Sequence, residues 1–177
     1  MIGVLVSGEG TNLQALLDER LPVVAVASNR PGVRALDRAE AAGVPAAIFE
    51  LDGFADREQR DATMANWLQE QGVRLVVCAG YMQLLTAPFL ARFPERIVNV
   101  HPSLLPDFPG ASAIDDALDA GVDITGVTVH LVDDGVDTGP IVRQVAVPVE
   151  PRESLEERIH AVEHQILPEV VRNLCVR

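Results

Sequence analysis

Short apolar runs alternate with helix-forming segments along the chain, and this alternation limits its fold more than any other feature. The segment from Ile2 to Glu19 shows the unit: an apolar run, a glycine-rich turn and then a helical pattern. Successive units of this kind, with no linker between them, are typical of helices that cover both faces of a largely parallel sheet. We therefore predict an α/β fold, a single doubly wound, mainly parallel sheet flanked by helices, as one domain over residues 1–177. Strands are expected to follow over residues 22–28, 44–50, 74–80, 97–101, 124–134 and 141–149, and helices over residues 33–43, 56–71, 112–121 and from 154 onward.

The charge of the chain limits the ligands that it binds. The formal net charge of −12 repels polyanions, so we expect no nucleic-acid partner. All 14 basic residues are arginines, which excludes the lysine of a Schiff base or of a phosphate-binding P-loop. An anionic ligand must instead be held by backbone N–H groups, helix N-termini or arginines.

The apolar runs are too short to span a bilayer, which needs roughly 18 residues or more. Met1 leads directly into an apolar strand without the basic segment of a signal peptide. We therefore expect a cytoplasmic protein with no membrane partner. The cysteines, Cys78 and Cys175, have neither metal-ligand spacing nor the pattern of a disulfide framework, and we expect reduced thiols.

Residues 97–110, IVNVHPSLLPDFPG, carry the strongest functional signal. An apolar strand end delivers Asn99 and His101, and because side chains alternate along a strand, both project from the same side. The prolines that follow prevent a regular strand or helix from continuing. Ligand sites in α/β sheets form at such carboxyl strand ends, so we expect the chemistry here. Taken alone, a turn-capping Asn99 and a hydrogen-bonded His101 are the alternative, and His130 is expected to pack beneath the site as a hydrogen-bonded residue.

The glycine-rich turn after the first strand is a second candidate site. Gly8 and Gly10 allow the backbone to approach a ligand, Thr11 and Asn12 add polar groups, and the positive end of the next helix points at the turn. This arrangement suits a phosphate group, with an ordinary turn as the alternative. Leu13 stands where a dinucleotide-binding G-x-G-x-x-G motif has its third glycine, so a dinucleotide is disfavoured.

The final helix has a start signal of its own. Ser154 and Glu157 have the spacing of a capping box, in which each satisfies a backbone N–H group at the helix start. Leu155 and Ile159 begin an apolar face at helical spacing. We expect the helix to start with this capping box and to pack by this face.

Both candidate sites resemble the folate-dependent formyltransferases. The resemblance rests on N-x-H-P-S-L-L-P followed by F-P-G in residues 99–110 and on G-x-G-T-N-L-Q in residues 8–14, and it extends over nearly the whole chain. The Pro-Gly ending is most similar to the branch of the family that serves purine biosynthesis. This resemblance implies a Rossmann-like fold and an enzyme that transfers the formyl group of 10-formyltetrahydrofolate to the amine of 5'-phosphoribosylglycinamide, also called glycinamide ribonucleotide. No metal is implied.

The resemblance also assigns catalytic and substrate-binding residues. It implies that Asn99 and His101 polarise the formyl group and that Asp137, in a later acidic loop, assists the histidine. The first glycine-rich turn would bind the nucleotide phosphate, and Glu163 on the final helix would accept hydrogen bonds from the ribose. The catalytic set is Asn99, His101 and Asp137, and the substrate-binding set is Gly10, Thr11, Asn12, Pro102 and Glu163.

Three segments are implied to bind the folate. Arg57 matches a position where the family places a cation near the folate, with an exposed surface arginine as the alternative. Residues 80–85 resemble the segment that lines the pterin pocket, although Gln83 replaces the usual basic residue, and residues 133–136 resemble a loop that closes over the pterin. Ser112 replaces a histidine that is frequent in the family. The folate-binding set is Arg57, Met82, Gln83, Leu84, Leu85, Asn99, Asp133, Asp134, Gly135, Val136 and Asp137.

Other functions stay open at this point. The acidic loop at residues 133–140 lacks the twelve-residue spacing and terminal glutamate of an EF-hand calcium loop. A 10-formyltetrahydrofolate hydrolase or another folate-dependent formyltransferase is an alternative, although such enzymes usually carry a further domain. A nucleotide-binding module that has lost the reaction is the alternative from a different class. We expect small-molecule substrates, and the sequence leaves the oligomeric state open, a homodimer included.

Overall fold

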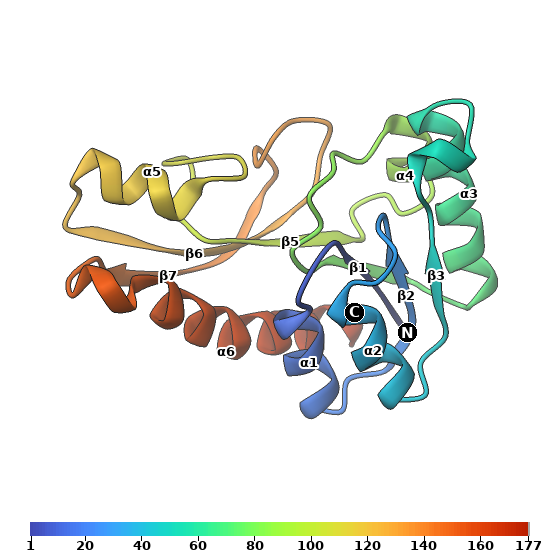
Figure 1. Cartoon of the computed structure of the whole chain (residues 1–177), viewed down its shortest axis with the longest axis horizontal. Coiled ribbons are helices and arrows are strands. Elements are labelled where there is room, and N and C mark those ends of the chain that lie inside the picture. Colours follow the sequence, from blue (N-terminus) through green and yellow to red (C-terminus); the bar gives the residue numbers. More distant parts are fainter. Residues whose placement is uncertain (177) are drawn as a thin grey trace.

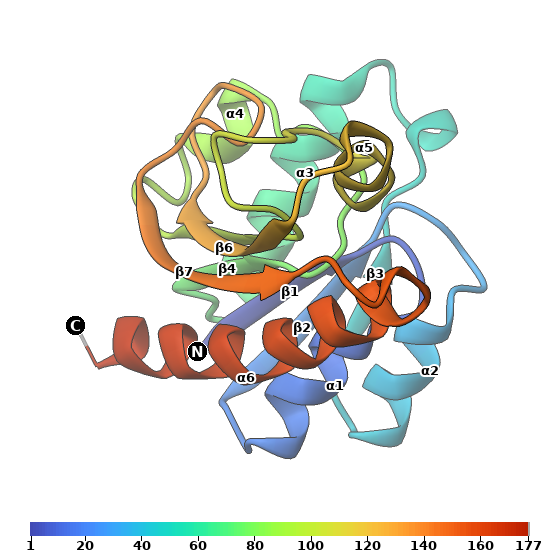
Figure 2. The same cartoon turned by 90° about the vertical axis from the view of Figure 1, so that its left-hand side faces the viewer.

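In the computed structural model, which describes residues 1–176, the chain forms a seven-stranded sheet with helices on both faces (Figures 1 and 2). Arg177, the last residue of the predicted domain, lies outside the described residues. The strands are β1 (Ile2–Val6), β2 (Val23–Ser28), β3 (Ala46–Ile48), β4 (Leu75–Cys78), β5 (Ile97–His101), β6 (Ile124–Leu131) and β7 (Ile141–Pro148). The helices are α1 (Thr11–Asp18), α2 (Arg34–Ala41), α3 (Arg57–Glu70), α4 (Ala87–Leu90), α5 (Ala113–Ala120) and α6 (Leu155–Cys175), with short 3-10 helices η1 (Leu51–Gly53) and η2 (Arg152–Ser154).

The order of the strands in the sheet is β3-β2-β1-β4-β5-β6-β7. The strands from β3 to β5 in this order run parallel to their neighbours. At the other end of the sheet, β6 is antiparallel to β5 and β7 is antiparallel to β6. The predicted fold class, a mainly parallel sheet flanked by helices, is therefore confirmed.

Two apolar layers bury the parallel part of the sheet. Helices α1, α2 and α6 cover one face, and α3 and α4 cover the other (Figures 1 and 2). Strand β1 shows why two layers are needed: Val4 packs with the first layer and Leu5 with the second, and both are fully buried. Because successive side chains point to opposite faces, a strand made only of apolar residues needs cover on both sides.

Helix α6 starts without the predicted capping box. Ser154 ends η2, and its Oγ donates to the carbonyl oxygen of Pro151 at 3.3 Å instead of capping the helix. Its backbone, with φ −109° and ψ 7°, is outside the extended region that a capping residue adopts, so this prediction is wrong. The predicted apolar face is confirmed, since Leu155 and Ile159 are buried. Neither α6 nor any other helix within residues 1–176 has the length and apolar character needed to cross a membrane.

The strand order reverses between β1 and β4, because the chain moves from β1 outward to β3 and then continues at β4 on the other side of β1. In open α/β sheets the crevice at such a reversal, at the carboxyl ends of the strands, is the usual ligand site. The segment 7–10 leaves β1 at this point, and the segment 79–86 leaves β4. The fold therefore places the predicted nucleotide loop beside the predicted folate loop.

Gly10 is the position in the first loop where the fold requires glycine. Its φ is +72°, and an added Cβ would lie 2.6 Å from Cβ of Ala35 on α2. We expect Gly10→Ala to lower the free energy of unfolding by about 2–4 kcal/mol, because a left-handed backbone and a steric overlap both destabilise the native state.

Gly8→Ala is the matched control, since nothing lies within 4 Å of its added Cβ. Urea denaturation of the two variants measures the difference. Equal losses of stability would contradict the steric argument at Gly10.

Candidate active site

The three predicted catalytic residues meet at the carboxylate of Asp137. Its Oδ2 accepts a hydrogen bond from the backbone N–H of Gly110 at 2.8 Å and lies 3.4 Å from Nδ1 of His101. Its Oδ1 accepts from Nδ2 of Asn99 at 3.4 Å. Asn99 and His101 are on β5, whereas Asp137 lies in the loop between β6 and β7. The structure therefore brings together residues 38 positions apart in the sequence.

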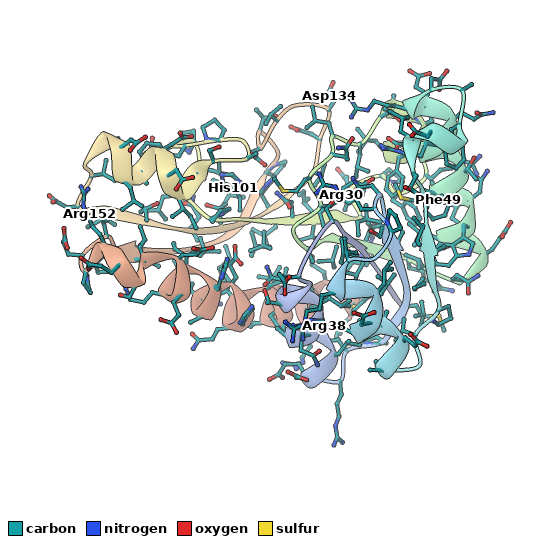
Figure 3. The ribbon with its side chains drawn as sticks, in the orientation of Figure 1. Arg30, Arg38, Phe49, His101, Asp134 and Arg152 are labelled. Atoms are coloured by element: carbon teal, nitrogen blue, oxygen red, sulfur yellow. The ribbon has the colours of Figure 1, made fainter. Side chains whose placement is uncertain are left out.

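The imidazole of His101 is held from both sides. It is buried, and its Nε2 donates to the carbonyl oxygen of Phe108 at 2.8 Å. A carbonyl oxygen can only accept, so Nε2 carries a proton, while Nδ1 faces the carboxylate of Asp137. Because both ring nitrogens face oxygen acceptors, the doubly protonated imidazolium is the form that satisfies both contacts. Figure 3 shows His101 below the loop whose tip carries Asp134.

The two residues that contact the imidazole of His101 both have a left-handed backbone. Phe108 has φ +52° and Asp137 has φ +53°. For residues other than glycine this conformation costs about 1–3 kcal/mol and is concentrated at functional sites. The fold thus holds both Phe108 and Asp137 in an unfavourable backbone conformation. Both residues contact His101, so these conformations fix the position of its imidazole.

His130 belongs to the same group of side chains. In the antiparallel register of β5 and β6 it lies opposite Asn99, with its Nε2 3.2 Å from Nδ2 of Asn99 and 3.5 Å from Oδ1 of Asp137. It is buried and its Nδ1 lies 2.8 Å from the carbonyl oxygen of Leu131. The expectation of a hydrogen-bonded histidine beneath the site is confirmed, and the structure adds a direct contact with Asn99 and Asp137.

The environment of Asp137 favours its ionised form. Burial by itself raises the pKa of this carboxyl, but the hydrogen bonds from His130 and the Gly110 N–H, together with the charges of His101 and His130, lower it below its ordinary value. Asp137 is therefore a carboxylate at neutral pH, placed between two imidazoles.

A cavity of about 100 Å³ opens beside this group. It lies at the edge of the sheet where β4 and β5 end, because Cys78 and Asn99 are paired in register there. Its lining includes the predicted residues Gln83, Leu84, Leu85, Asn99, Asp133, Asp134, Gly135 and Asp137. It also includes Tyr81, from the predicted pterin segment, and Cys78, His130 and Val132, which the sequence did not assign to the cavity.

The positions of these additional residues explain how they were missed. Cys78 is the last residue of β4. It stands in an apolar run, so the sequence indicated a core residue and not a residue at the cavity. Burial raises the pKa of its thiol to about 12, so it lines the cavity as a neutral group. Val132 directly follows β6, again at a strand end. Strand ends were therefore the signal that could have identified both residues.

Three predicted folate-binding residues do not line the cavity. Met82 and Val136 are 52% and 45% exposed. Arg57, at the first position of α3, is exposed and its Nη2 donates to the carbonyl oxygen of Leu84 at 2.7 Å. The side chain of Arg57 therefore contacts the backbone of the segment that lines the cavity. Met82 and Val136 lie at the outer surface of their loops.

The predicted nucleotide site lies at the start of α1. Gly10 precedes the helix, Thr11 is half-buried and Pro102 directly follows His101, the predicted catalytic histidine. Nδ2 of Asn12 donates to Oε2 of Glu163 on α6 at 2.9 Å, and both side chains are buried. Burial raises the pKa of Glu163, while the hydrogen bond from Asn12 and the charge of His160 act against this shift. The hydrogen bond from Asn12 thus connects the segment predicted to bind the phosphate to Glu163, the residue predicted to bind the ribose.

A positive charge lies next to this loop. Arg38 lies on α2 (Figure 3). Its Nε donates to the carbonyl oxygen of Glu9 at 2.8 Å, and its Nη1 donates to Oε1 of Gln14 at 3.0 Å. A hollow of about 380 Å³ runs along α1 beside Arg38. Within residues 1–176, no group of three or more His, Cys, Asp or Glu side chains is arranged to hold a metal ion.

Comparison with known proteins agrees with this fold. The sequence pattern of the formyl transferase family matches residues 1–171. The chain belongs to the formyl transferase family.

Within this family, the chain is similar to several named proteins. The chain is 45% identical to the trifunctional purine biosynthetic protein adenosine-3 of Drosophila melanogaster over 98% of its length, but it spans only 14% of that protein. It is 41% identical to the phosphoribosylglycinamide formyltransferase of Haemophilus influenzae, covering 97% of this chain and 85% of the relative. The crystal structure of glycinamide ribonucleotide transformylase 1 from Symbiobacterium toebii is similar with a TM-score of 0.93 and 50% identity, covering 97% of this chain and 85% of that one.

The lowered pKa of Asp137 predicts a pH dependence of stability. A carboxyl group with a depressed native pKa stabilises the fold at pH values above its ordinary value of 3.8, and this contribution is lost as the pH falls through the lower native pKa. We expect Asp137→Asn to be less stable than the wild type near pH 6, and the two to converge as the pH falls below 3.8.

Urea denaturation over a series of pH values tests this expectation. Asp134→Asn, which removes an exposed carboxylate from the same loop, is the control and should follow the wild type throughout. A constant difference between Asp137→Asn and the wild type at every pH would show that the loss is steric and not electrostatic.

Proposed function

We propose that this chain transfers the formyl group of 10-formyltetrahydrofolate to the amine of glycinamide ribonucleotide in purine biosynthesis. The observation that carries the proposal is the meeting of Asn99 and His101 at the Asp137 carboxylate, on the rim of the cavity where β4 and β5 end. The names of the relatives support glycinamide ribonucleotide as the acceptor and a formyl group as the group transferred. The single domain over residues 1–177, the absence of a metal requirement, the cytoplasmic location and a homodimer stay predictions.

The catalytic group suits acyl transfer to an amine. When the amine attacks the formyl carbon, negative charge develops on the formyl oxygen, and N–H donors aimed at that oxygen stabilise the transition state. The Asn99 amide supplies such a donor at the cavity. His101 on the same strand, with its two ring nitrogens engaged by the carbonyl oxygen of Phe108 and by Asp137, adds positive charge beside it. The carboxylate of Asp137 balances the positive charge of His101 and fixes its orientation. Bond changes balance: the carbon gains the amine nitrogen and loses N10 of the folate, and the proton released by the amine is taken up at N10.

The folate half of the site is the cavity beside Asn99. A pterin ring is flat and carries several N–H donors and acceptors on its edge. The apolar side chains of Leu84 and Leu85 suit the ring faces, and the carboxylates of Asp133 and Asp134 with nearby main-chain groups suit its edge. Asp133 is itself ordered, because its Oδ1 accepts hydrogen bonds from Gly135 N at 3.1 Å and Thr138 Oγ1 at 2.7 Å.

The nucleotide half is the loop before α1. Backbone N–H groups at a helix N-terminus bind phosphate without lysine, and the chain contains no lysine. Asn12 and Arg38 add polar and positive groups around this loop. We assign the phosphate to Gly10, Thr11 and Asn12, the ribose to Glu163, and the segment leading to the amine to Pro102 and the catalytic residues.

A deformylation assay tests the function. The full chain is mixed with 10-formyltetrahydrofolate, with and without glycinamide ribonucleotide, and loss of the formyl group from the folate is followed spectroscopically. We expect turnover that requires the nucleotide. Turnover independent of the nucleotide would identify a 10-formyltetrahydrofolate hydrolase, and nucleotide binding without turnover would identify a non-catalytic module. Turnover with a different amine acceptor would identify another formyltransferase.

Asn99 provides a test of the catalytic assignment. We expect Asn99→Ala to fold normally and to reduce kcat by roughly 10²- to 10³-fold, the usual effect of removing one oxyanion donor. Nucleotide affinity, measured by calorimetry, should be unchanged, because Asn99 lies on the folate side of the site. A variant that keeps near-normal kcat would remove Asn99 from the mechanism.

A further inference from the structure

The segment Gly80–Thr86, which we call the pterin loop, forms one wall of the cavity but has no regular structure of its own. Tyr81, Gln83, Leu84 and Leu85 line the cavity, and the segment forms neither helix nor strand. A loop without internal secondary structure keeps its shape only through hydrogen bonds to surrounding elements. The residues that make those bonds therefore determine the shape of the proposed folate site.

Asp61 on α3 holds the end of the pterin loop. Its side chain is fully buried, and its Oδ2 accepts two hydrogen bonds from Thr86, from the backbone N at 2.8 Å and from Oγ1 at 2.9 Å. Its Oδ1 accepts from Nε and Nη2 of Arg60 at 2.9 Å and 2.7 Å. Both carboxylate oxygens are thus used, one by the loop and one by a cation.

The pair formed by Arg60 and Asp61 is unusual because it is removed from water. Arg60 is 1% exposed and Asp61 is fully buried. Burying two charges carries a desolvation penalty that their attraction offsets only in part, so such a pair is weak as a source of stability. What the pair does provide is a fixed, negatively charged acceptor at one place beneath the pterin loop. Charge-assisted hydrogen bonds to that acceptor are stronger than bonds between neutral groups.

Two further contacts hold the rest of the pterin loop. The backbone N–H of Met82 donates to Oγ of Ser7 at 2.9 Å, and the same Oγ donates to Oδ1 of Asn29 at 2.6 Å. Arg57 donates to the carbonyl oxygen of Leu84 at 2.7 Å. Ser7 directly follows β1 and Asn29 directly follows β2, so this contact fixes the loop to the carboxyl edge of the sheet.

We propose that Asp61 is a positioning residue for the folate half of the active site, which acts through Thr86 on the shape of the pterin loop. This inference rests on the proposed function for the identity of the ligand. Asp61 is absent from the lining of the cavity, and its effect is transmitted by the two hydrogen bonds to Thr86. The pterin loop then presents Gln83, Leu84 and Leu85 to the ligand in one preformed arrangement.

The experiment removes one of the two bonds without disturbing the buried pair. Thr86→Val deletes the hydroxyl and keeps both the branched shape and the backbone N–H, whereas Thr86→Ser keeps the hydroxyl. Thr63→Val is the matched control, because Thr63 is on the same helix as Asp61, is exposed, and its Oγ1 donates only to a backbone carbonyl of α3, that of Gln59, at 2.8 Å. Hydrogen–deuterium exchange, tetrahydrofolate binding and steady-state kinetics are measured for all three variants.

Thr86→Val is expected to increase the exchange rate of amides in residues 82–86 and to raise both the Kd for tetrahydrofolate and the KM for the formyl donor by roughly tenfold, as for a lost hydrogen bond to a charged group. The KM for the nucleotide and the kcat at saturating folate should change less than about twofold, since uniform binding alone is lost. Thr86→Ser should recover most of the affinity, and Thr63→Val should match the wild type.

Two results would overturn the inference. The first is a Thr86→Val variant whose amide exchange rates and Kd for tetrahydrofolate equal those of the wild type. The second is an equal change of these quantities in Thr86→Val and Thr63→Val, which would indicate a general loss of stability. Failure of the proposed function is seen separately, as a wild type that binds tetrahydrofolate but transfers no formyl group to the nucleotide. In that case a weaker binding of tetrahydrofolate by Thr86→Val still supports the role of Asp61.

Discussion

The carboxylate of Asp137 is the interaction on which the site depends. It joins three separate parts of the chain, because it accepts from Asn99 on β5, from the backbone of Gly110 in the loop after β5, and lies beside His130 on β6. A partly buried carboxylate is stable only where donors and positive charge surround it. Two of the groups around Asp137, Asn99 and His101, are also those that the proposed reaction uses.

The sheet supplies the frame for this carboxylate. The reversal of strand order puts the ends of β1 and β4 side by side, and each strand continues into a loop assigned to one of the two substrates. Ser7 connects these loops directly, since it precedes Gly8 in the chain and accepts a hydrogen bond from Met82. Phosphate and pterin would then be held by neighbouring loops fixed to one rigid edge, which orients two substrates without a hinge between domains.

Most of the fold and the centre of the site could be predicted from the sequence, because the signals are local. The alternation of apolar runs with helical segments specified the sheet, and the polar pair Asn99 and His101 at a strand end specified where the catalytic loop lies. The contacts of His130 depend on the register between β5 and β6, which no local pattern contains. Likewise, Arg60 and Asp61 look like solvent-exposed helix residues in the sequence, and only tertiary packing shows that they are buried.

The left-handed backbone at position 137 restricts which residue types fit there. The site needs a negative charge between His101 and His130, and the chain there needs a residue that tolerates φ near +53°. Glycine and asparagine adopt this conformation readily but carry no charge, and glutamate carries the charge but lacks the short side chain that favours it. Aspartate is the residue that meets both demands. Position 137 is thus constrained twice, by electrostatics and by backbone geometry.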